Sequence, residues 1–338
     1  MSGSLGSGIR ASIEALPRQI RQGWELGRMA ALPPAYKKTT HAVVSGMGGS
    51  SLGAHVMLTA CADRLKIPVE TVNGYELPPY VGKDTLVILS SYSGTTEETL
   101  ATAHQAAKKG AKCVVLTVGG ALGDLAKKKR WPLILLDAEN NPSNQPRMGV
   151  GSSAMAIHGI FAALGHLKLT DADVKKMERA AAQDESATAK TLASRIGDRA
   201  IFFLASEHLL GAAHVANNQV NENAKRISAF FALPEFNHHF LEGLSYPTQI
   251  KRDVVAVLFQ SERYHPQNQK RVTLTAEQLS KNRIEPIIVT LDGGGKLEEA
   301  WRLIRLGASL SLELALRQNI DPEPVPNVEA FKKALAAK

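Results

Sequence analysis

The chain has 338 residues and a formal net charge of +8, and 44% of its residues are hydrophobic. This length predicts two domains with sizeable cores, and the positive charge favours anionic partners, either nucleic acid or small phosphorylated metabolites. Aromatic residues make up only 5%, which is few for a protein that stacks on single strands. The two cysteines, Cys61 and Cys113, lie far apart in the sequence and form no disulfide framework.

The composition also argues against export and membrane insertion. Residues 1–10 are small and polar and lack the apolar core of a signal peptide. No run approaches the roughly 20 apolar residues that a membrane helix needs. A protein of the reducing cytoplasm, with no membrane partner, is therefore expected.

The first half of the chain is predicted to alternate short strands with helices. Apolar residues at near-helical spacing predict an N-terminal helix over residues 13–29. Strands are predicted at residues 42–45, 68–72, 85–90, 112–117 and 133–136, with helices between them such as 52–65 and 96–109. Strands that are apolar throughout and separated by helices indicate a parallel sheet covered on both faces.

The second half repeats this pattern after an interruption. Residues 140–149, NNPSNQPRMG, are a loop by composition, and a long helical section follows to about residue 195. Strands are then predicted at 199–205, 227–231, 254–259 and 285–290, and helices at 207–225, 266–281 and 297–317. The prediction is an α/β protein with domains at 1–150 and 151–338, the second including the connecting helices.

The first candidate site is the glycine turn GMGGSS at residues 46–51, between a strand and a helix. It is not a nucleotide loop, because Ala54 stands where the P-loop lysine belongs and Ser51 replaces the third glycine of GxGxxG. Glycines let backbone N–H groups approach an anion closely at the positive end of a helix. An ordinary tight turn with a serine cap is the alternative.

The second candidate site is SSYSGTTEET at residues 90–99, which also joins a strand to a helix. Four hydroxyl groups surround its glycine, at Ser91, Ser93, Thr95 and Thr96, whereas capping needs only one. Two such turns at the carboxyl ends of neighbouring parallel strands can converge on one ligand. Together they favour a phosphate monoester over two unrelated capped turns.

Both turns resemble the sugar isomerase (SIS) domain, a flavodoxin-like fold that binds phosphosugars. The resemblance implies that Gly49, Ser50, Ser91, Ser93 and Thr96 bind the sugar phosphate. It covers about residues 40–150 and fits a non-catalytic phosphosugar-binding regulator as well as an enzyme.

Motifs of the second half make the resemblance more specific. They are QPRMGVG at 145–151, NNQVNENAK at 217–225 and LPEFNHHFLEG at 233–243. With them, nearly the whole chain resembles the bifunctional phosphoglucose/phosphomannose isomerases. The resemblance implies active-site roles for Arg147, Glu222 and His238 and for a lysine of the last helix. That lysine best matches Lys332, with Lys333 as the alternative register.

The implied chemistry is an aldose–ketose isomerisation of glucose 6-phosphate, with mannose 6-phosphate as second substrate. Glu222 would carry the proton between C1 and C2 through a cis-enediol, and Arg147 would hold the enediolate. His238 would move the proton that opens the ring, and Lys332 would assist at the anomeric hydroxyl. The family works as a homodimer whose partner supplies the histidine.

Three further observations bound this hypothesis. The family attributes its phosphomannose activity to a threonine near the C-terminal end of the site, and residues 319–338 contain none. No amidotransferase cysteine precedes the unit, which argues against glucosamine 6-phosphate synthase. There is no HExxH motif or cysteine–histidine cluster, and His239 with Glu242 is a weak pair, so no metal or other cofactor is expected.

Overall fold

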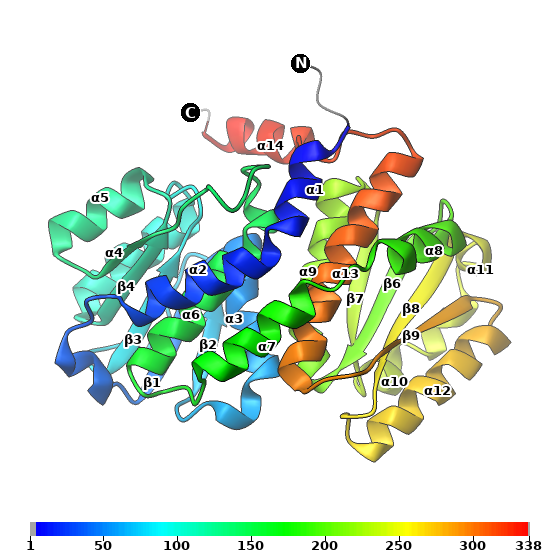
Figure 1. Ribbon diagram of the computed structural model, residues 1–338, viewed down its shortest axis with the longest axis horizontal. Helices are drawn as coiled ribbons and strands as arrows, with labels where there is room; N and C mark the ends of the chain where they lie inside the picture. The colour runs from blue at the N-terminus through cyan, green and yellow to red at the C-terminus, as the bar shows by residue number, and fades with distance from the viewer. Residues whose placement is uncertain (1–4, 337–338) are drawn as a thin grey trace.

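The computed structural model describes residues 5–336 and contains two parallel β-sheets on either side of a central group of helices (Figure 1). Residues 1–4 and 337–338, which the expected domain limits include, lie outside the described residues. The first sheet has the order β2-β1-β3-β4-β5 and the second the order β7-β6-β8-β9, and every pairing is parallel. The predicted α/β fold with two flavodoxin-like sheets is confirmed.

The strands follow the predicted segments closely. They are β1 (His41–Ser45), β2 (Val69–Val72), β3 (Thr85–Ser90), β4 (Lys112–Thr117), β5 (Leu133–Leu135), β6 (Ala200–Ser206), β7 (Ser228–Leu233), β8 (Val254–Ser261) and β9 (Glu285–Leu291). Every residue of β3 is buried, as expected for a central strand with helices on both faces.

The helices cover both sheets and fill the space between them. They are α1 (Ser7–Glu14), α2 (Leu16–Arg28), α3 (Gly49–Ala60), α4 (Glu97–Lys109), α5 (Gly120–Lys129), α6 (Val150–Ala163), α7 (Asp171–Ala181), α8 (Ser186–Ile196), α9 (Leu210–Asn223), α10 (Phe236–His239), α11 (Ile250–Asp253), α12 (Pro266–Lys281), α13 (Lys296–Arg317) and α14 (Pro326–Ala336). Short 3-10 turns are η1 (Pro34–Lys38), η2 (Ala62–Arg64), η3 (Pro146–Met148), η4 (Glu207–Leu209) and η5 (Glu242–Ser245). Among residues 5–336, no helix has the length and apolar character needed to cross a membrane.

The N-terminal helix predicted over 13–29 is present as α2, but it begins three residues later than predicted, and a separate helix, α1, precedes it. The chain forms two helices, α1 and α2, that meet at Ala15. Pro17 has no amide hydrogen to donate to the carbonyl of Ile13, so the helical ladder is interrupted there. That carbonyl instead accepts a hydrogen bond from the guanidinium of Arg305.

The long helical section predicted after residue 150 consists of three helices, α6, α7 and α8. Gly165 follows α6 with a φ of 81°, a left-handed conformation that suits glycine and ends the helix. Thr170 then starts α7 with a capping box, because its hydroxyl accepts from the Asp173 amide while the Asp173 carboxylate accepts from the Thr170 amide.

Close helix packing joins the two sheets into one molecule. A Cβ atom on Gly27 of α2 would lie 2.2 Å from the carbonyl oxygen of Ala156 of α6. A Cβ on Gly211 of α9 would lie 2.6 Å from the Cα of Val56 of α3. One cluster of buried side chains contains residues of both sheets, such as Ile88 of β3. The C-terminal half of α9 is held beside η3, because Gln219 Nε2 donates to the Arg147 carbonyl at 3.2 Å.

Candidate active site

The two predicted phosphate turns lie side by side at the topological switch point of the first sheet. They follow β1 and β3, which are neighbours, whereas β2 pairs with β1 on its other side. The carboxyl ends of strands at such a point are where ligands of open α/β sheets bind. The Tyr92 amide of the second turn donates to the Ser50 Oγ of the first at 3.0 Å, so the two turns are joined directly.

The four hydroxyl groups of the second turn form a set of two hydrogen-bonded pairs. Ser91 Oγ lies 2.8 Å from Thr96 Oγ1 and accepts from the Gly94 amide at 3.1 Å. Ser93 Oγ lies 3.0 Å from Thr95 Oγ1. Ser91 is fully buried and Ser93 is exposed, so the set runs from the interior of the turn to its surface.

At the first turn the amides of Ser50 and Ser51 donate to the carbonyls of Met47 and Gly48 at 3.1 and 3.0 Å, so backbone donors for a ligand come chiefly from the N-terminus of α4. Among the described residues, neither Gly48, the N-cap of α3, nor Thr96, the N-cap of α4, makes a side-chain capping hydrogen bond. The N–H groups of a helix's first turn have no partners within the helix, and they carry the positive end of its dipole. The turns therefore offer hydroxyl and amide donors to one anion.

Arg147 lies against the first turn. A Cβ atom on Gly49 would be 3.2 Å from the Arg147 amide nitrogen, so a larger residue there would require η3 to move away by a few tenths of an ångström. The loop before η3 is fixed by Asn141, whose amide donates to the Tyr92 hydroxyl at 3.1 Å and to the Gln145 carbonyl at 2.9 Å. The predicted loop of residues 140–149 is thus tied to the second phosphate turn as well.

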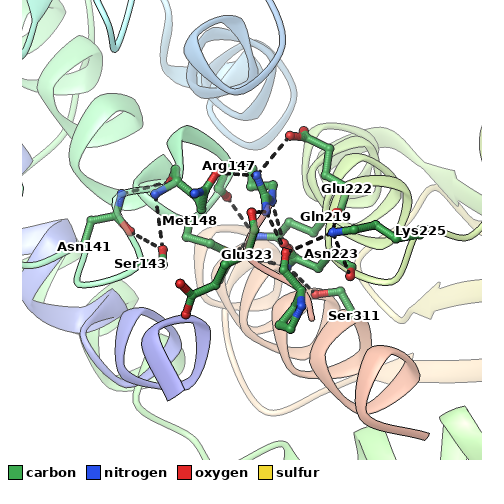
Figure 2. A network of polar contacts seen from close by, with 12 residues as sticks. Asn141, Ser143, Arg147, Met148, Gln219, Glu222, Asn223, Lys225, Ser311 and Glu323 are labelled. Atoms are coloured by element: carbon green, nitrogen blue, oxygen red, sulfur yellow. Dashed lines mark hydrogen bonds and ion pairs between the residues drawn. The ribbon is translucent and has the colours of Figure 1, made fainter. Parts of the chain in front are cut away.

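The guanidinium of Arg147 is buried, with 1% of the side chain exposed, and all five of its N–H groups are used (Figure 2). The acceptors are Asn223 Oδ1 at 2.5 Å, Gln145 Oε1 at 2.8 Å, Glu222 Oε2 at 3.3 Å and the carbonyls of Pro322 and Glu323, both at 2.8 Å. Such saturation offsets the cost of burying the charge. Burial lowers the pKa of Arg147, and the neighbouring Glu222 carboxylate opposes that shift.

Glu222 occupies the last turn of α9 and keeps 32% of its side chain exposed. Burial raises the pKa of its carboxyl group, while the charges of Arg147, Lys225 and Lys332 act in the opposite direction. A carboxylate with a raised pKa is a stronger base, as proton abstraction requires.

The C-terminal helix brings a lysine toward this carboxylate. The positive charge of Lys332, on α14, is among the influences that lower the pKa of Glu222. Of the two candidate lysines, Lys332 is the one whose charge acts on Glu222. Most of α14 is exposed, including Phe331 at 68%.

His238 does not join the other predicted residues within one chain. It lies on the short helix α10, after β7 of the second sheet, and is exposed. Figure 1 shows α10 near the lower edge of the second domain and α14 along the upper edge of the molecule. The structure thus brings together the phosphate turns, Arg147, Glu222 and Lys332, and separates His238 from them.

The corresponding end of the second sheet is filled by a side chain of the protein. Glu299 is 2% exposed, and its carboxylate accepts from Ser261 Oγ at 2.6 Å and lies 2.7 Å from His208 Nε2. Arg263 Nε lies 3.4 Å from its other oxygen. The side chains of Glu299 and His208 thus occupy this end of the second sheet, whereas the corresponding end of the first sheet carries the two hydroxyl-rich turns.

Sequence reasoning missed the residues that surround Arg147. Gln145 and Asn223 stand in the motifs, but nothing in their spacing indicates that both bind the same guanidinium. The two main-chain carbonyls of Pro322 and Glu323 left no signal, because every residue has a carbonyl. As for metals, residues 5–336 contain no group of three or more His, Cys, Asp or Glu side chains that could hold an ion.

The two hydroxyl-rich turns and Arg147 lie within one SIS domain, and Glu222 lies within a second SIS domain, that of a phospho-glucose isomerase. The SIS domain model matches residues 35–158. The model of the bacterial phospho-glucose isomerase C-terminal SIS domain matches residues 185–335.

Comparison with known proteins makes the assignment specific. A bifunctional phosphoglucose/phosphomannose isomerase of Caldicellulosiruptor bescii is 30% identical over 342 residues, which cover 96% of this chain and 98% of that one. One from Aquifex aeolicus is 31% identical over 87% and 89% of the two chains. A hypothetical protein from Thermus thermophilus shares the fold, with a TM-score of 0.75, 18% identity and coverage of 99% and 92%. The chain belongs to the bifunctional phosphoglucose/phosphomannose isomerase family.

Proposed function

We propose that the protein interconverts glucose 6-phosphate and fructose 6-phosphate, and mannose 6-phosphate with the same ketose, through a cis-enediol. The observation that carries this proposal is the position of Glu222 beside Arg147, next to the phosphate turns. Membership of the isomerase family favours this enzyme over a non-catalytic phosphosugar-binding regulator.

In this proposal the sugar phosphate binds at the first sheet. Gly49 and the hydroxyls of Ser50, Ser91, Ser93 and Thr96 contact its oxygens, assisted chiefly by the N-terminus of α4. Hydrogen bonds to a charged group contribute about 1.5–3 kcal/mol each. With the phosphate held there, the far end of the opened sugar extends toward Arg147 and Glu222.

The proton transfer uses Glu222 as the base. It removes the proton from C2 of the aldose and returns it to C1, so no net proton is consumed. The negative charge that develops on the enediolate oxygen is stabilised by Arg147, which cannot be deprotonated under these conditions. Substrate would displace the contact between Nη1 of Arg147 and Glu222, which at 3.3 Å is the longest of the five.

Ring opening needs a second proton donor and acceptor, which we assign to His238 of the partner subunit in a homodimer. The exposure of His238 and its distance from its own chain's site support an action across an interface. Lys332 assists at the anomeric hydroxyl. We further propose that the protein works in the reducing cytoplasm, in keeping with its two buried free cysteines. We also propose that the boundary between its two domains follows residue 150.

The same intermediate serves both aldoses, because C2 of a cis-enediol is planar and can accept a proton on either face. The absence of threonine from residues 319–338 means that another side chain would accommodate mannose 6-phosphate. The test is a coupled assay of the purified protein with fructose 6-phosphate, which measures glucose 6-phosphate and mannose 6-phosphate separately. Formation of neither product would contradict the proposal.

A further inference from the structure

Lys225 lies three residues after Glu222 and has no place in the reaction described above. Its Nζ atom donates to the carbonyl oxygen of Glu222 at 2.7 Å and to that of Pro322 at 3.2 Å, and it lies 3.5 Å from the carbonyl of Asn223 (Figure 2). One ammonium group thus connects the end of α9 to a segment almost 100 residues further along the chain.

That segment, the C-terminal strap, comprises residues 321–323 and leads into α14. Arg147 binds the strap through the carbonyls of Pro322 and Glu323, so the Pro322 carbonyl accepts from two cations. The strap is also fixed on its other side, because the Glu323 carboxylate accepts from the Gly8 amide of α1 at 3.1 Å. The position of the strap is therefore set by Arg147 and Lys225 on one side and by α1 on the other.

The backbone at Lys225 indicates that its side chain matters. Its φ is 51°, in the left-handed region, and it follows the C-cap Ala224 of α9. Glycine is the usual residue at this position, because a Cβ atom strains the backbone there. Lysine at this position makes the helix end less stable than glycine would. What lysine contributes instead is the set of hydrogen bonds made by its ammonium group.

We propose that Lys225 is a positioning residue for the isomerase reaction: it fixes the carboxylate of Glu222 relative to the C-terminal strap and thereby to Lys332. The inference rests on the proposed function. The geometric basis of the proposal is that α14 is largely exposed and has few contacts of its own to hold it. The location of Lys332 therefore depends on the C-terminal strap that precedes the helix.

Lys225 also contributes charge to the environment of Glu222. The cations that act on this carboxylate are Arg147, Lys225 and Lys332, and the nearby acids Asp321 and Glu323 act on Lys225 and Arg147, respectively. Removing the Lys225 charge should raise the pKa of Glu222 further. The acid limb of the kcat profile should then move to higher pH, because the base form is populated only above that pKa.

The test compares Lys225→Gly, Lys225→Arg and the exposed control Lys281→Met with the wild type. Glycine relieves the backbone strain, so Lys225→Gly should fold with an unchanged or higher Tm. We expect its kcat to fall on the order of ten- to a hundredfold, its KM to change little because the phosphate turns are untouched, and its acid limb to move upward. Lys225→Arg should restore most of kcat and return the acid limb of the pH profile to its wild-type position. Lys281→Met should match the wild type in both.

Hydrogen–deuterium exchange of residues 321–336 provides a readout that does not depend on activity. It should be faster in Lys225→Gly and unchanged in Lys281→Met. The positioning role would be overturned if Lys225→Gly kept the wild-type kcat and the wild-type acid limb of the pH profile. It would also be overturned if the hydrogen–deuterium exchange of residues 321–336 were unchanged. Either result would leave the proposed function intact. A loss of kcat with no shift of the limb and no rescue by arginine would also overturn the positioning role. An inactive wild type would contradict the proposed function, and the exchange comparison would still decide whether Lys225 holds the strap.

Discussion

Nη1 of Arg147 lies 3.3 Å from Oε2 of Glu222, the longest of the five contacts made by that guanidinium. The other four acceptors come from side chains and carbonyls that the fold holds in place. Glu222 also keeps 32% of its side-chain surface exposed. A substrate oxygen can therefore enter between these two groups without releasing Arg147 from its surroundings.

Replacing Glu222 by glutamine should abolish isomerisation, because glutamine keeps the size of the side chain but cannot accept the proton. Binding of an open-chain phosphosugar acid should stay within about tenfold of the wild type. The decisive measurement is NMR of the C2 proton of glucose 6-phosphate in deuterium oxide, with the exposed Glu277→Gln as control. Exchange at the wild-type rate in Glu222→Gln would assign the base to another residue.

The pH dependence of kcat should report the same carboxylate. Burial raises the pKa of Glu222, and only the ionised form is a base. The rate should therefore be maintained above this raised pKa and fall as the pH is lowered through it. Steady-state rates measured between pH 4 and pH 8 test this, and an acid limb at the ordinary glutamate pKa, about 4.3, would count against the assignment.

Replacing Ser93 by alanine should weaken substrate binding by about 1.5–3 kcal/mol, the contribution of a hydrogen bond to a charged group. Ser93 suits this test because it is exposed and accepts a long hydrogen bond from the Thr95 amide, at 3.3 Å, whereas the buried Ser91 accepts from the Gly94 amide at 3.1 Å and its loss would disturb the turn more. The measurement is the inhibition constant of an open-chain phosphosugar acid, with the exposed Ser280→Ala as control. An unchanged constant in Ser93→Ala would remove Ser93 from the phosphate site.

Mixing two inactive variants tests whether His238 acts across a subunit interface. If each site takes Glu222 from one subunit and His238 from the other, a heterodimer of His238→Ala and Glu222→Gln contains one intact site. Random exchange of subunits should then restore about a quarter of the wild-type activity. No recovery after verified subunit exchange would show that both residues must come from the same chain.

Activity should survive prolonged treatment with EDTA, because the acid–base groups of the proposed mechanism need no metal. The measurement is the isomerase rate before and after dialysis against the chelator. Loss of activity that zinc or another divalent ion restores would contradict the mechanism.

Acid should destabilise the fold through His158, which is fully buried on α6 and whose Nδ1 donates to the Ala154 carbonyl at 2.7 Å. Burial lowers the pKa of His158 to about 4. Between that value and the ordinary pKa of about 6.5 the unfolded chain binds the proton and the folded chain does not. The free energy of unfolding should therefore fall by up to about 3 kcal/mol as the pH drops through this interval. Urea unfolding at pH 6.5 and 4.5 measures it, and His158→Gln should reduce the difference.

The sequence by itself determined the strands and both phosphate turns. β3 was predicted at its observed limits because its four central residues, 86–89, are apolar and polar turns flank the strand. Each turn is contiguous in the chain, so its glycines and hydroxyls could be read together. Even the break between α1 and α2 was present as Pro17, although the apolar spacing across it suggested one helix.

Only the tertiary structure decided which groups surround Arg147 and which chain end approaches Glu222. The C-terminal strap binds Arg147 and Lys225 through main-chain carbonyls, which are the same in every residue and leave no pattern. The separation of His238 from Glu222 is equally invisible in the sequence, since it depends on how the second sheet packs against the first. Local chemistry is encoded residue by residue, whereas contacts between distant segments arise from the packing of all the helices at once.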